Sequence, residues 1–342
     1  MTAFRLLIVA ALIVAAAGWY VFYPRPPAPT GPHPVGFLDM PLQVSPGTTL
    51  PVAIWYPRDL AKPAPVILFS PGWGSRRTQN RLQTENLASH GFVVVACDDI
   101  ASDPATDPNH GVFLDLLSDA GTKASIERAG RNAVAQGARL IAVLDALTAA
   151  GGKLTGLPVT LELGRVGALG YSMGGTSTLA AAAKDPRIAG VFNLDGGLFG
   201  PAADDIVVPA YFLLSSLEAF PSQAELSSPD AYTRNYALIS ALDIPRNRRR
   251  MERPMSYWAQ LPHAGHGDLG DGLFVCSSGE WQRTNFERRA MYSAIAELEV
   301  AFFRSVLLGE PAPLHGLLGH SDQTLRWISP TSPPAGTAKA RQ

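Results

Sequence analysis

Ser172 stands between two glycines in the run Gly170-Tyr171-Ser172-Met173-Gly174. An apolar stretch, Val166 to Leu169, leads directly into this run, and a chain of small residues that favours a helix follows it. A strand, a sharp turn and a helix in this order expose the serine side chain at the turn, and the glycines leave room for closely approaching backbone. The pattern predicts that Ser172 is a nucleophile.

A serine hydroxyl is a weak nucleophile and needs a histidine base that a carboxylate orients. Four histidines follow Ser172 in the chain: His263, His266, His315 and His320. The last two lie in a segment rich in Pro and Gly that offers no rigid support. His266 is the expected base, because small residues on both sides let its ring reach into a cleft. His263 directly follows a proline and is expected to pack in the loop.

Two acidic residues between the serine and the histidine could orient the base. Asp195 ends the apolar run Ala189 to Leu194 and precedes two glycines, and Glu218 follows the next apolar run. A charge directly after a buried strand needs a partner, so Asp195 is the first candidate. Glu218 remains an alternative.

Acyl transfer also needs donors for the negative oxygen of the intermediate. One expected donor is the backbone N–H of Met173, directly after the nucleophile. The second is expected in the Gly-rich loop Ser70 to Gly74, which follows a buried strand, and we assign it to the N–H of Trp73.

The histidine loop also contains residue types that could bind a metal ion. His263, His266, Asp268 and Asp271 are ligand types that hydrolytic metal sites use. Their spacing matches neither an H-x-H-x-D run nor an H-E-x-x-H helix. The sequence therefore predicts no metal and no other cofactor.

The elements that must position these residues alternate between short apolar runs and longer helical ones, which is typical of an α/β protein with a mostly parallel sheet. The expected strands are 50–56, 65–70, 92–97, 165–171, 189–194, 209–214 and 255–261. The expected helices are 79–90, 123–150, 174–184 and 285–307. A long mixed segment, 198–253, interrupts the pattern and predicts a lid-like insert before the last strand.

The beginning of the chain has a different character. Leu6 to Tyr23 is an uncharged run of 18 residues, close to the length of about 20 that spans a bilayer. It is expected to be a signal anchor or a cleavable signal peptide, with the catalytic domain outside the cytoplasm. The predicted organisation is this segment at 1–23, a Pro-rich linker at 24–35, the catalytic domain at 36–308 and a Pro- and Gly-rich tail at 309–342.

Composition excludes other classes of protein. The chain has 342 residues, a formal net charge of -1 and 46% hydrophobic residues. A nucleic-acid-binding protein would carry a basic excess, and a disordered chain would be less apolar. Two cysteines, Cys97 and Cys276, make no disulfide framework, and their redox state stays open.

Over about 200 residues the sequence resembles the α/β-hydrolases of the platelet-activating factor acetylhydrolase type, with dienelactone-hydrolase-like and polyester-hydrolase-like enzymes as neighbours. The most specific stretches are Leu68 to Gly74, Leu87 to Val94, the run around Ser172, and Leu194 to Gly197. The resemblance implies the α/β-hydrolase fold and supports Asp195 and His266 as triad members. Two departures are Pro71-Gly72, where the family commonly has His-Gly, and Tyr171, where it commonly has His.

Together these features predict a serine ester hydrolase that acts on short-chain acyl or phospholipid-type esters. A polyester or cutinase-like hydrolase and a lipase are alternatives on the same fold. From another class, a membrane-tethered binding protein without catalysis would also fit the fold.

Overall fold

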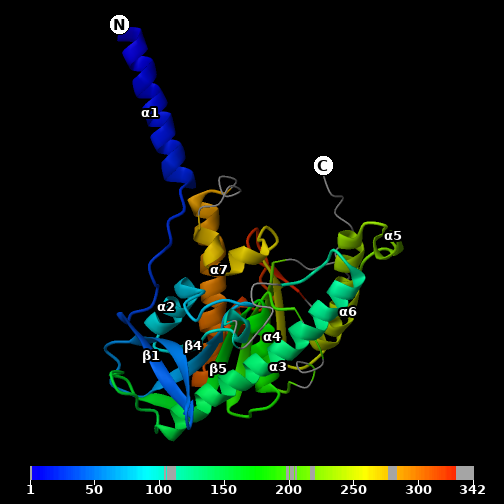
Figure 1. Ribbon diagram of the computed structural model, residues 1–342. Coiled ribbons are helices and arrows are strands. Elements are labelled where there is room, and N and C mark those ends of the chain that lie inside the picture. The colour runs from blue at the N-terminus through cyan, green and yellow to red at the C-terminus, as the bar shows by residue number, and fades with distance from the viewer. Residues whose placement is uncertain are drawn as a thin grey trace.

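The computed structural model describes residues 2–103, 105, 113–197, 200, 204, 206–215, 220–275 and 283–328. Its centre is a nine-stranded sheet in the order β1-β2-β4-β3-β5-β6-β7-β8-β9 (Figure 1). The strands are β1 Val35–Ser45, β2 Thr48–Pro57, β3 Ala64–Ser70, β4 Val93–Cys97, β5 Leu161–Tyr171, β6 Ile188–Leu194, β7 Ala210–Leu214, β8 Ser256–Gln260 and β9 Arg326–Trp327. From β4 to β8 neighbouring strands are parallel, and the pairs β1–β2, β2–β4 and β8–β9 are antiparallel.

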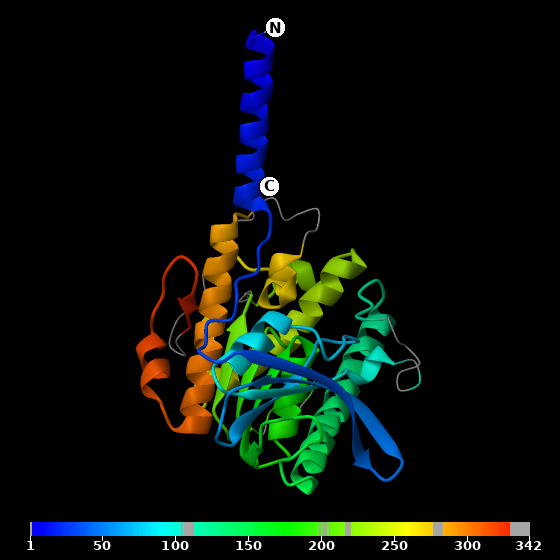
Figure 2. The same ribbon diagram turned by 90° about the vertical axis from the view of Figure 1, so that its left-hand side faces the viewer.

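Helices cover both faces of this sheet (Figures 1 and 2). The α-helices are α1 Thr2–Phe22, α2 Arg81–Ser89, α3 Asp119–Ala149, α4 Met173–Ala182, α5 Gln223–Leu226, α6 Ala231–Met251, α7 Asn285–Phe303 and α8 Ala312–Leu317. Short helical turns lie at η1 Ile100–Ser102, η3 His266–Leu269, η4 Asp271–Phe274 and η6 Arg304–Leu308. The mostly parallel sheet between helices confirms the predicted fold class.

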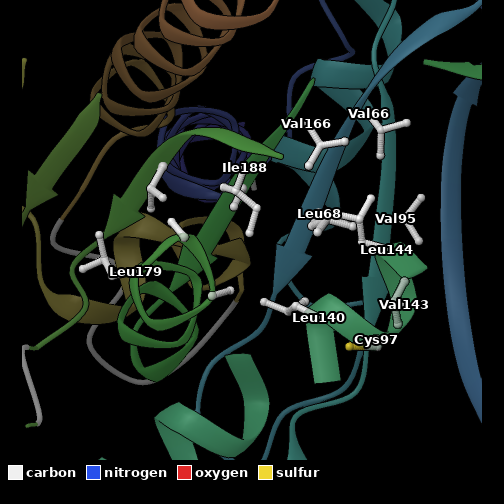
Figure 3. Close-up of a cluster of buried hydrophobic side chains, with 14 of the residues drawn as sticks. Val66, Leu68, Val95, Cys97, Leu140, Val143, Leu144, Val166, Leu179 and Ile188 are labelled. Atoms are coloured by element: carbon white, nitrogen blue, oxygen red, sulfur yellow. The ribbon is translucent and has the colours of Figure 1, made fainter. Parts of the chain in front are cut away.

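The alternation of side chains along the strands divides the core into two layers. Val66 and Leu68 of β3 pack with Leu140 and Leu144 of α3, in the cluster that Figure 3 shows. The intervening Ile67 and Phe69 face the other layer, which α2, α7 and α8 cover. Because β3 is buried on both faces, its sequence is a continuous apolar run, as expected of a central parallel strand.

The first helix projects away from the domain in both views (Figures 1 and 2). Among the residues that the structure describes, no helix is both long and apolar enough to cross a bilayer. The expected membrane anchor or signal peptide therefore finds no support here.

The segment predicted as a linker lies along the catalytic domain. The N–H of Thr30 donates to Oδ1 of Asn86 at 2.9 Å, and the N–H of His33 donates to the carbonyl of Ser89 at 3.0 Å. Both acceptors belong to α2, so this stretch is fixed to the domain by side-chain and backbone hydrogen bonds that composition does not reveal.

The first part of the predicted C-terminal tail belongs to the same domain. Leu314 of α8 and Ile328 are buried, and β9 pairs with β8, Trp327 opposite Ala259. The packed domain thus continues to 328, and β9 rather than the predicted strand 255–261 is the last strand. The lid-like insert contains α5 and α6, while its residues 216–219 lie outside the described part of the chain.

Candidate active site

The expected catalytic side chains meet at one edge of the sheet. Ser172 directly follows β5, Asp195 directly follows β6, and His266 lies six residues after the end of β8. Carboxyl ends of parallel strands lie along the same edge, where ligand sites of open α/β sheets form. Parallel pairing therefore brings together residues that are far apart in the sequence.

Ser172 lies on a strained turn. Its backbone has φ 55° and ψ -128°, a region that non-glycine residues rarely adopt. The N–H of Ser172 donates to the carbonyl of Leu194 at 2.8 Å, which ties the turn to β6. A Cβ at Gly170 would lie 2.2 Å from the carbonyl oxygen of Gly174, so only glycine fits there. The turn thus has the geometry that the glycine pattern predicted.

His266 connects the serine to the carboxylate. Its Nε2 lies 2.9 Å from Oγ of Ser172, and its Nδ1 lies 2.7 Å from Oδ2 of Asp195. A carboxylate at Nδ1 selects the tautomer with the proton on Nδ1, which leaves Nε2 free to accept the serine proton. The side chain of His266 is 53% exposed and that of Asp195 only 11%, so the base faces solvent while its orienting acid is largely covered.

Asp195 is held by hydrogen bonds from Ser215, which directly follows β7, and by the turn in which it lies at the end of β6. Its Oδ1 accepts the N–H of Ser215 at 2.8 Å, and its Oδ2 accepts the Ser215 hydroxyl at 2.5 Å. The backbone of Asp195 has a positive φ of 55°, in a turn that Asn193 closes by accepting the N–H of Gly196 at 2.6 Å. The structure places Asp195 in contact with the base, and the alternative acid Glu218 lies outside the described residues.

The loop that carries His266 is held from two sides. The hydroxyl of Tyr171 donates to the His266 carbonyl at 3.0 Å, and the two rings stack with centroids 5.1 Å apart. Burial, with the nearby charges of Asp195 and Asp268, raises the pKa of Tyr171 to about 12, so its hydroxyl keeps the donated proton. Asp268 accepts the N–H of Gly265 at 2.6 Å and pairs with Arg283, also at 2.6 Å.

The other residues of the histidine loop have separate contacts. His263 is exposed, and its carbonyl accepts a hydrogen bond from Arg283. Asp271 accepts the N–H groups of Arg81 and Leu82 at 2.9 and 3.2 Å, at the beginning of α2. In the described ranges of the chain, no group of three or more His, Cys, Asp or Glu side chains could hold a metal ion.

The two expected oxyanion donors belong to segments that touch. Met173 is the first residue of α4, where backbone N–H groups have no partner within the helix. Trp73 packs against Met173 together with Ala129 and Ala133 of α3. The two residues whose N–H groups are the candidate donors are therefore neighbours, and their role as oxyanion donors stays a prediction.

Sequence reasoning missed Ser215 and treated Tyr171 only as a departure from a family pattern. Ser215 could have been found, because it directly follows β7, the parallel neighbour of β6, and Asp195 directly follows β6. The stacking of Tyr171 on His266 depends on the path of a distant loop and has no sequence signal.

Comparison with known proteins places this geometry in a family. A profile of the dienelactone hydrolase family matches residues 51–225. A probable 1-alkyl-2-acetylglycerophosphocholine esterase of Arthroderma benhamiae is 27% identical over 145 residues, which are 41% of this chain and 33% of that protein. The match therefore spans about a third of the relative's length. The solved ferulic acid esterase from Streptomyces cinnamoneus has a TM-score of 0.58 at 19% identity, covering 89% of this chain and 99% of that chain.

The solved esterase shows that the fold is that of the α/β-hydrolases. The family profile covers just over half of the sequence, so the chain belongs to the dienelactone hydrolase family. In this family member, Ser172, His266 and Asp195 have the contacts of a Ser-His-Asp catalytic triad. The resemblance to α/β-hydrolase esterases that the sequence indicated is confirmed.

Proposed function

We propose that this protein is a serine hydrolase that cleaves short-chain acyl esters, including phospholipid-type esters, through an acyl-enzyme. The observation that carries the mechanism is the continuous pair of hydrogen bonds from Ser172 through His266 to Asp195. These two hydrogen bonds raise the nucleophilicity of the serine hydroxyl, which is otherwise unreactive at neutral pH.

In the acylation step Oγ of Ser172 forms a bond to the carbonyl carbon of the ester, and Nε2 of His266 takes the hydroxyl proton. The electron pair of the C=O π bond moves to the oxygen, and the N–H groups of Trp73 and Met173 donate hydrogen bonds to it. Asp195 stabilises the imidazolium that has formed. Collapse of the intermediate breaks the ester C–O bond, and His266 returns the proton to the leaving alkoxide.

In the deacylation step water replaces the alcohol. His266 takes a proton from water, the resulting hydroxide adds to the acyl carbon, and collapse breaks the bond to Oγ of Ser172. The proton on His266 returns to the serine, and the carboxylic acid leaves. The exposed position of the His266 ring gives water access to it.

The substrate class is supported by the relative from Arthroderma benhamiae, a probable 1-alkyl-2-acetylglycerophosphocholine esterase. The test is a series of p-nitrophenyl esters from acetate to palmitate, with 1-alkyl-2-acetylglycerophosphocholine and a solid polyester as further substrates. We expect the highest kcat/KM for acetate or butyrate. A maximum at long acyl chains would indicate a lipase, and preferential release of products from the polyester would indicate a polyester hydrolase.

The mechanism is tested with the unchanged protein and the Ser172→Ala variant. A fluorophosphonate probe should label the unchanged protein at Ser172, and Ser172→Ala should lose at least about 10³-fold in kcat, since removal of a triad member costs several orders of magnitude. Full activity of Ser172→Ala would exclude the mechanism. A lack of labelling and of ester hydrolysis in the unchanged protein would favour a binding protein instead.

A further inference from the structure

The loop after β3 contains a tight turn at the candidate oxyanion site. The N–H of Ser75 donates to the carbonyl of Gly72 at 3.0 Å, which closes a four-residue turn. Gly74, the third residue, has a φ of +68°, as a type II turn requires. Trp73 occupies the second position of this turn.

The turn lies against the nucleophile. A Cβ added at Gly72 would be 3.4 Å from Cβ of Ser172, and a Cβ at Gly174 would be 2.1 Å from the carbonyl oxygen of Ser70. The loop after β3 and the beginning of α4 are therefore in direct contact. A small rotation of the turn would change where the N–H of Trp73 points relative to Ser172.

Side chains fix the N–H groups on both sides of Trp73. The N–H of Gly72 donates to Oε1 of Gln79 at 2.7 Å. The N–H of Gly74 donates to Oδ1 of Asp99 at 2.8 Å. Within the part of the chain that the structure describes, the N–H of Trp73 between them has no hydrogen-bond partner. This single donor is thus left for a ligand while both of its neighbours are bound.

Asp99 is itself fixed at the end of β4. It is fully buried, its Oδ1 also accepts the N–H of Ala101 at 3.0 Å, and its own N–H donates to the carbonyl of Ser75 at 3.1 Å. Burial raises the pKa of Asp99 to about 6, against the opposing effect of these N–H groups and of Arg139. Asp99 thus contacts the turn at two points, at Gly74 through its carboxylate and at Ser75 through its backbone N–H.

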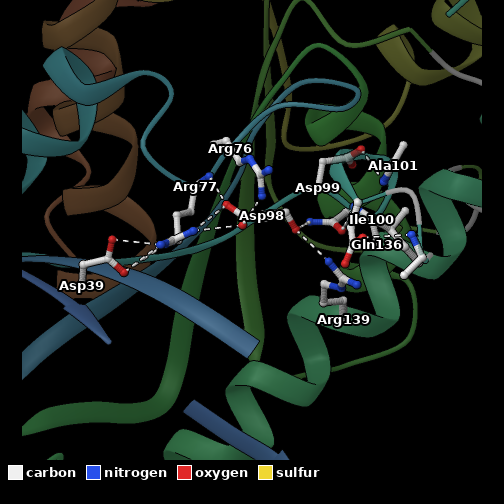
Figure 4. A network of polar contacts seen from close by, with 11 residues as sticks. Asp39, Arg76, Arg77, Asp98, Asp99, Ile100, Ala101, Gln136 and Arg139 are labelled. Carbon is white, nitrogen blue, oxygen red and sulfur yellow. Dashed lines mark hydrogen bonds and ion pairs between the residues drawn. The ribbon is translucent and has the colours of Figure 1, made fainter. Parts of the chain in front are cut away.

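A second set of polar contacts holds the neighbouring residues in place (Figure 4). Asp98 accepts the N–H of Arg77 at 2.7 Å and its guanidinium at 2.9 Å, and Arg77 also pairs with Asp39 of β1 at 2.9 Å. From α3, Arg139 and Gln136 donate to the carbonyl of Asp98 at 3.1 and 3.4 Å. The end of β4 is therefore anchored to two other elements and is a firm support for the turn.

We propose that Gln79 and Asp99 are positioning residues of the oxyanion hole, which together orient the N–H of Trp73 toward the carbonyl oxygen of the ester. The proposal rests on the proposed function, because it concerns the same acyl transfer. Neither side chain touches the substrate. Each acts through the backbone N–H that it accepts, so its loss lowers stabilisation of the oxyanion and leaves substrate binding in place.

The test measures kcat and KM for p-nitrophenyl acetate in three variants. Gln79→Met and Asp99→Ala each remove one acceptor and are expected to lower kcat by about 10- to 100-fold, less than the 10²- to 10³-fold that loss of an oxyanion donor itself costs. KM should change less than threefold. Asp99→Asn keeps an acceptor oxygen at the same place and should retain kcat within about fivefold of the unchanged protein.

Asp185→Ala is the matched control. Asp185 is also buried and accepts a backbone N–H, that of Arg187 at 2.9 Å, but it precedes β6 at the opposite edge of the sheet. It should keep kcat, whatever its effect on the melting temperature. If Asp99→Ala does not fold, Gln79→Met alone tests the proposal. This variant is expected to fold, because Gln79 is only half-buried and methionine has nearly the same shape.

Two results would overturn the proposal while leaving the enzyme function intact. One is kcat within threefold of the unchanged protein in folded Gln79→Met and Asp99→Ala. The other is a folded Asp99→Asn variant as inactive as Asp99→Ala. Failure of the proposed function would give a different result, because the unchanged protein would then neither hydrolyse esters nor react with a fluorophosphonate at Ser172. In that case the proposed role of Gln79 and Asp99 would also be wrong.

Discussion

At the scale of single residues, the carboxylate of Asp195 has more partners than a Ser-His-Asp set requires. It accepts the Nδ1 proton of His266 and two further hydrogen bonds from Ser215, one from the backbone and one from the hydroxyl. Both the hydroxyl and Nδ1 meet the same oxygen, Oδ2. Ser215 therefore fixes the direction in which Asp195 presents that oxygen to the base.

Ser215→Ala should lower kcat by roughly tenfold with KM nearly unchanged. A hydrogen bond to a charged group contributes about 1.5–3 kcal/mol, and about 1.4 kcal/mol of lost transition-state stabilisation is a factor of ten in rate. The backbone N–H of Ser215 remains, which limits the loss. The measurement is steady-state hydrolysis of p-nitrophenyl acetate.

Ser256→Ala is the control for this change. Its hydroxyl accepts the indole N–H of Trp258 at 2.7 Å, at the beginning of β8 and away from the triad. It should leave kcat unchanged. An equal kcat in the unchanged protein and in Ser215→Ala would show that the backbone N–H alone holds Asp195.

At the scale of elements, the parts that carry the chemistry are those that the sequence predicts best. The central strands β3, β5 and β6 are buried on both faces, so long apolar runs mark them and polar residues mark their ends. Ser172 and Asp195 directly follow two such runs, which is why their positions could be inferred without a structure.

The edges of the sheet could not be predicted in the same way. β1 is an edge strand with alternating exposed positions and polar residues, and β9 has only two residues. Their strand conformation depends on pairing with β2 and with β8, the latter about 65 residues away in the sequence, rather than on an apolar pattern of their own. The contacts of Gln79 and Asp99 were likewise not predictable, since each depends on the exact path of a loop.

The connection between η4 and α2 gives a prediction at this scale. Asp271 accepts the first two N–H groups of α2, whereas Asn80, the residue before this helix, makes no capping hydrogen bond with its side chain. Asp271→Ala should lower the free energy of unfolding by about 1 kcal/mol, the usual cost of losing a helix cap. Because the same segment carries His266, kcat should also fall several-fold. Urea unfolding and ester hydrolysis measure the two effects.

Asp322→Ala is the control for Asp271→Ala. It shows what the loss of a carboxylate that accepts two backbone N–H groups does when the residue is not connected to the histidine loop. Asp322 also accepts two consecutive N–H groups, those of Thr324 and Leu325 at 2.7 and 2.8 Å, but it lies before β9 on a segment without catalytic residues. Its kcat should equal that of the unchanged protein. Asp271→Ala with unchanged stability and unchanged kcat would refute the proposed support of the histidine loop.

At the scale of the whole molecule, two apolar layers enclose the sheet, and one of the flanking helices carries a buried acid. Glu299 of α7 is fully buried, and within the described part of the chain neither of its carboxylate oxygens has a hydrogen-bond partner. Burial raises the pKa of Glu299 well above its ordinary value. The fold therefore favours the neutral, protonated form of this side chain over the charged form.

A raised pKa in the folded state has a definite sign for stability. Below the pKa of an unfolded glutamate, about 4.3, Glu299 is protonated in both the folded and the unfolded state. Its full contribution to the free energy of unfolding is then present. Above it the unfolded state loses a proton that the folded state keeps, so the free energy of unfolding falls by about 1.4 kcal/mol per pH unit until the folded pKa is reached. Asp99 acts in the same direction, but only up to its own pKa of about 6. A comparison with a variant at position 299 alone cancels the contributions of the other groups.

Glu299→Gln, which has nearly the same shape and no proton to lose, should remove this dependence. Relative to the variant, the unchanged protein should lose unfolding free energy as the pH rises from about 5, by about 1.4 kcal/mol per pH unit until the folded pKa of Glu299 is reached, as measured by urea unfolding. Glu297→Gln, an exposed position on the same helix, should follow the unchanged protein in parallel. A difference between Glu299→Gln and the unchanged protein that stays constant above about pH 5 would mean that Glu299 is ionised in the folded protein and would contradict the prediction.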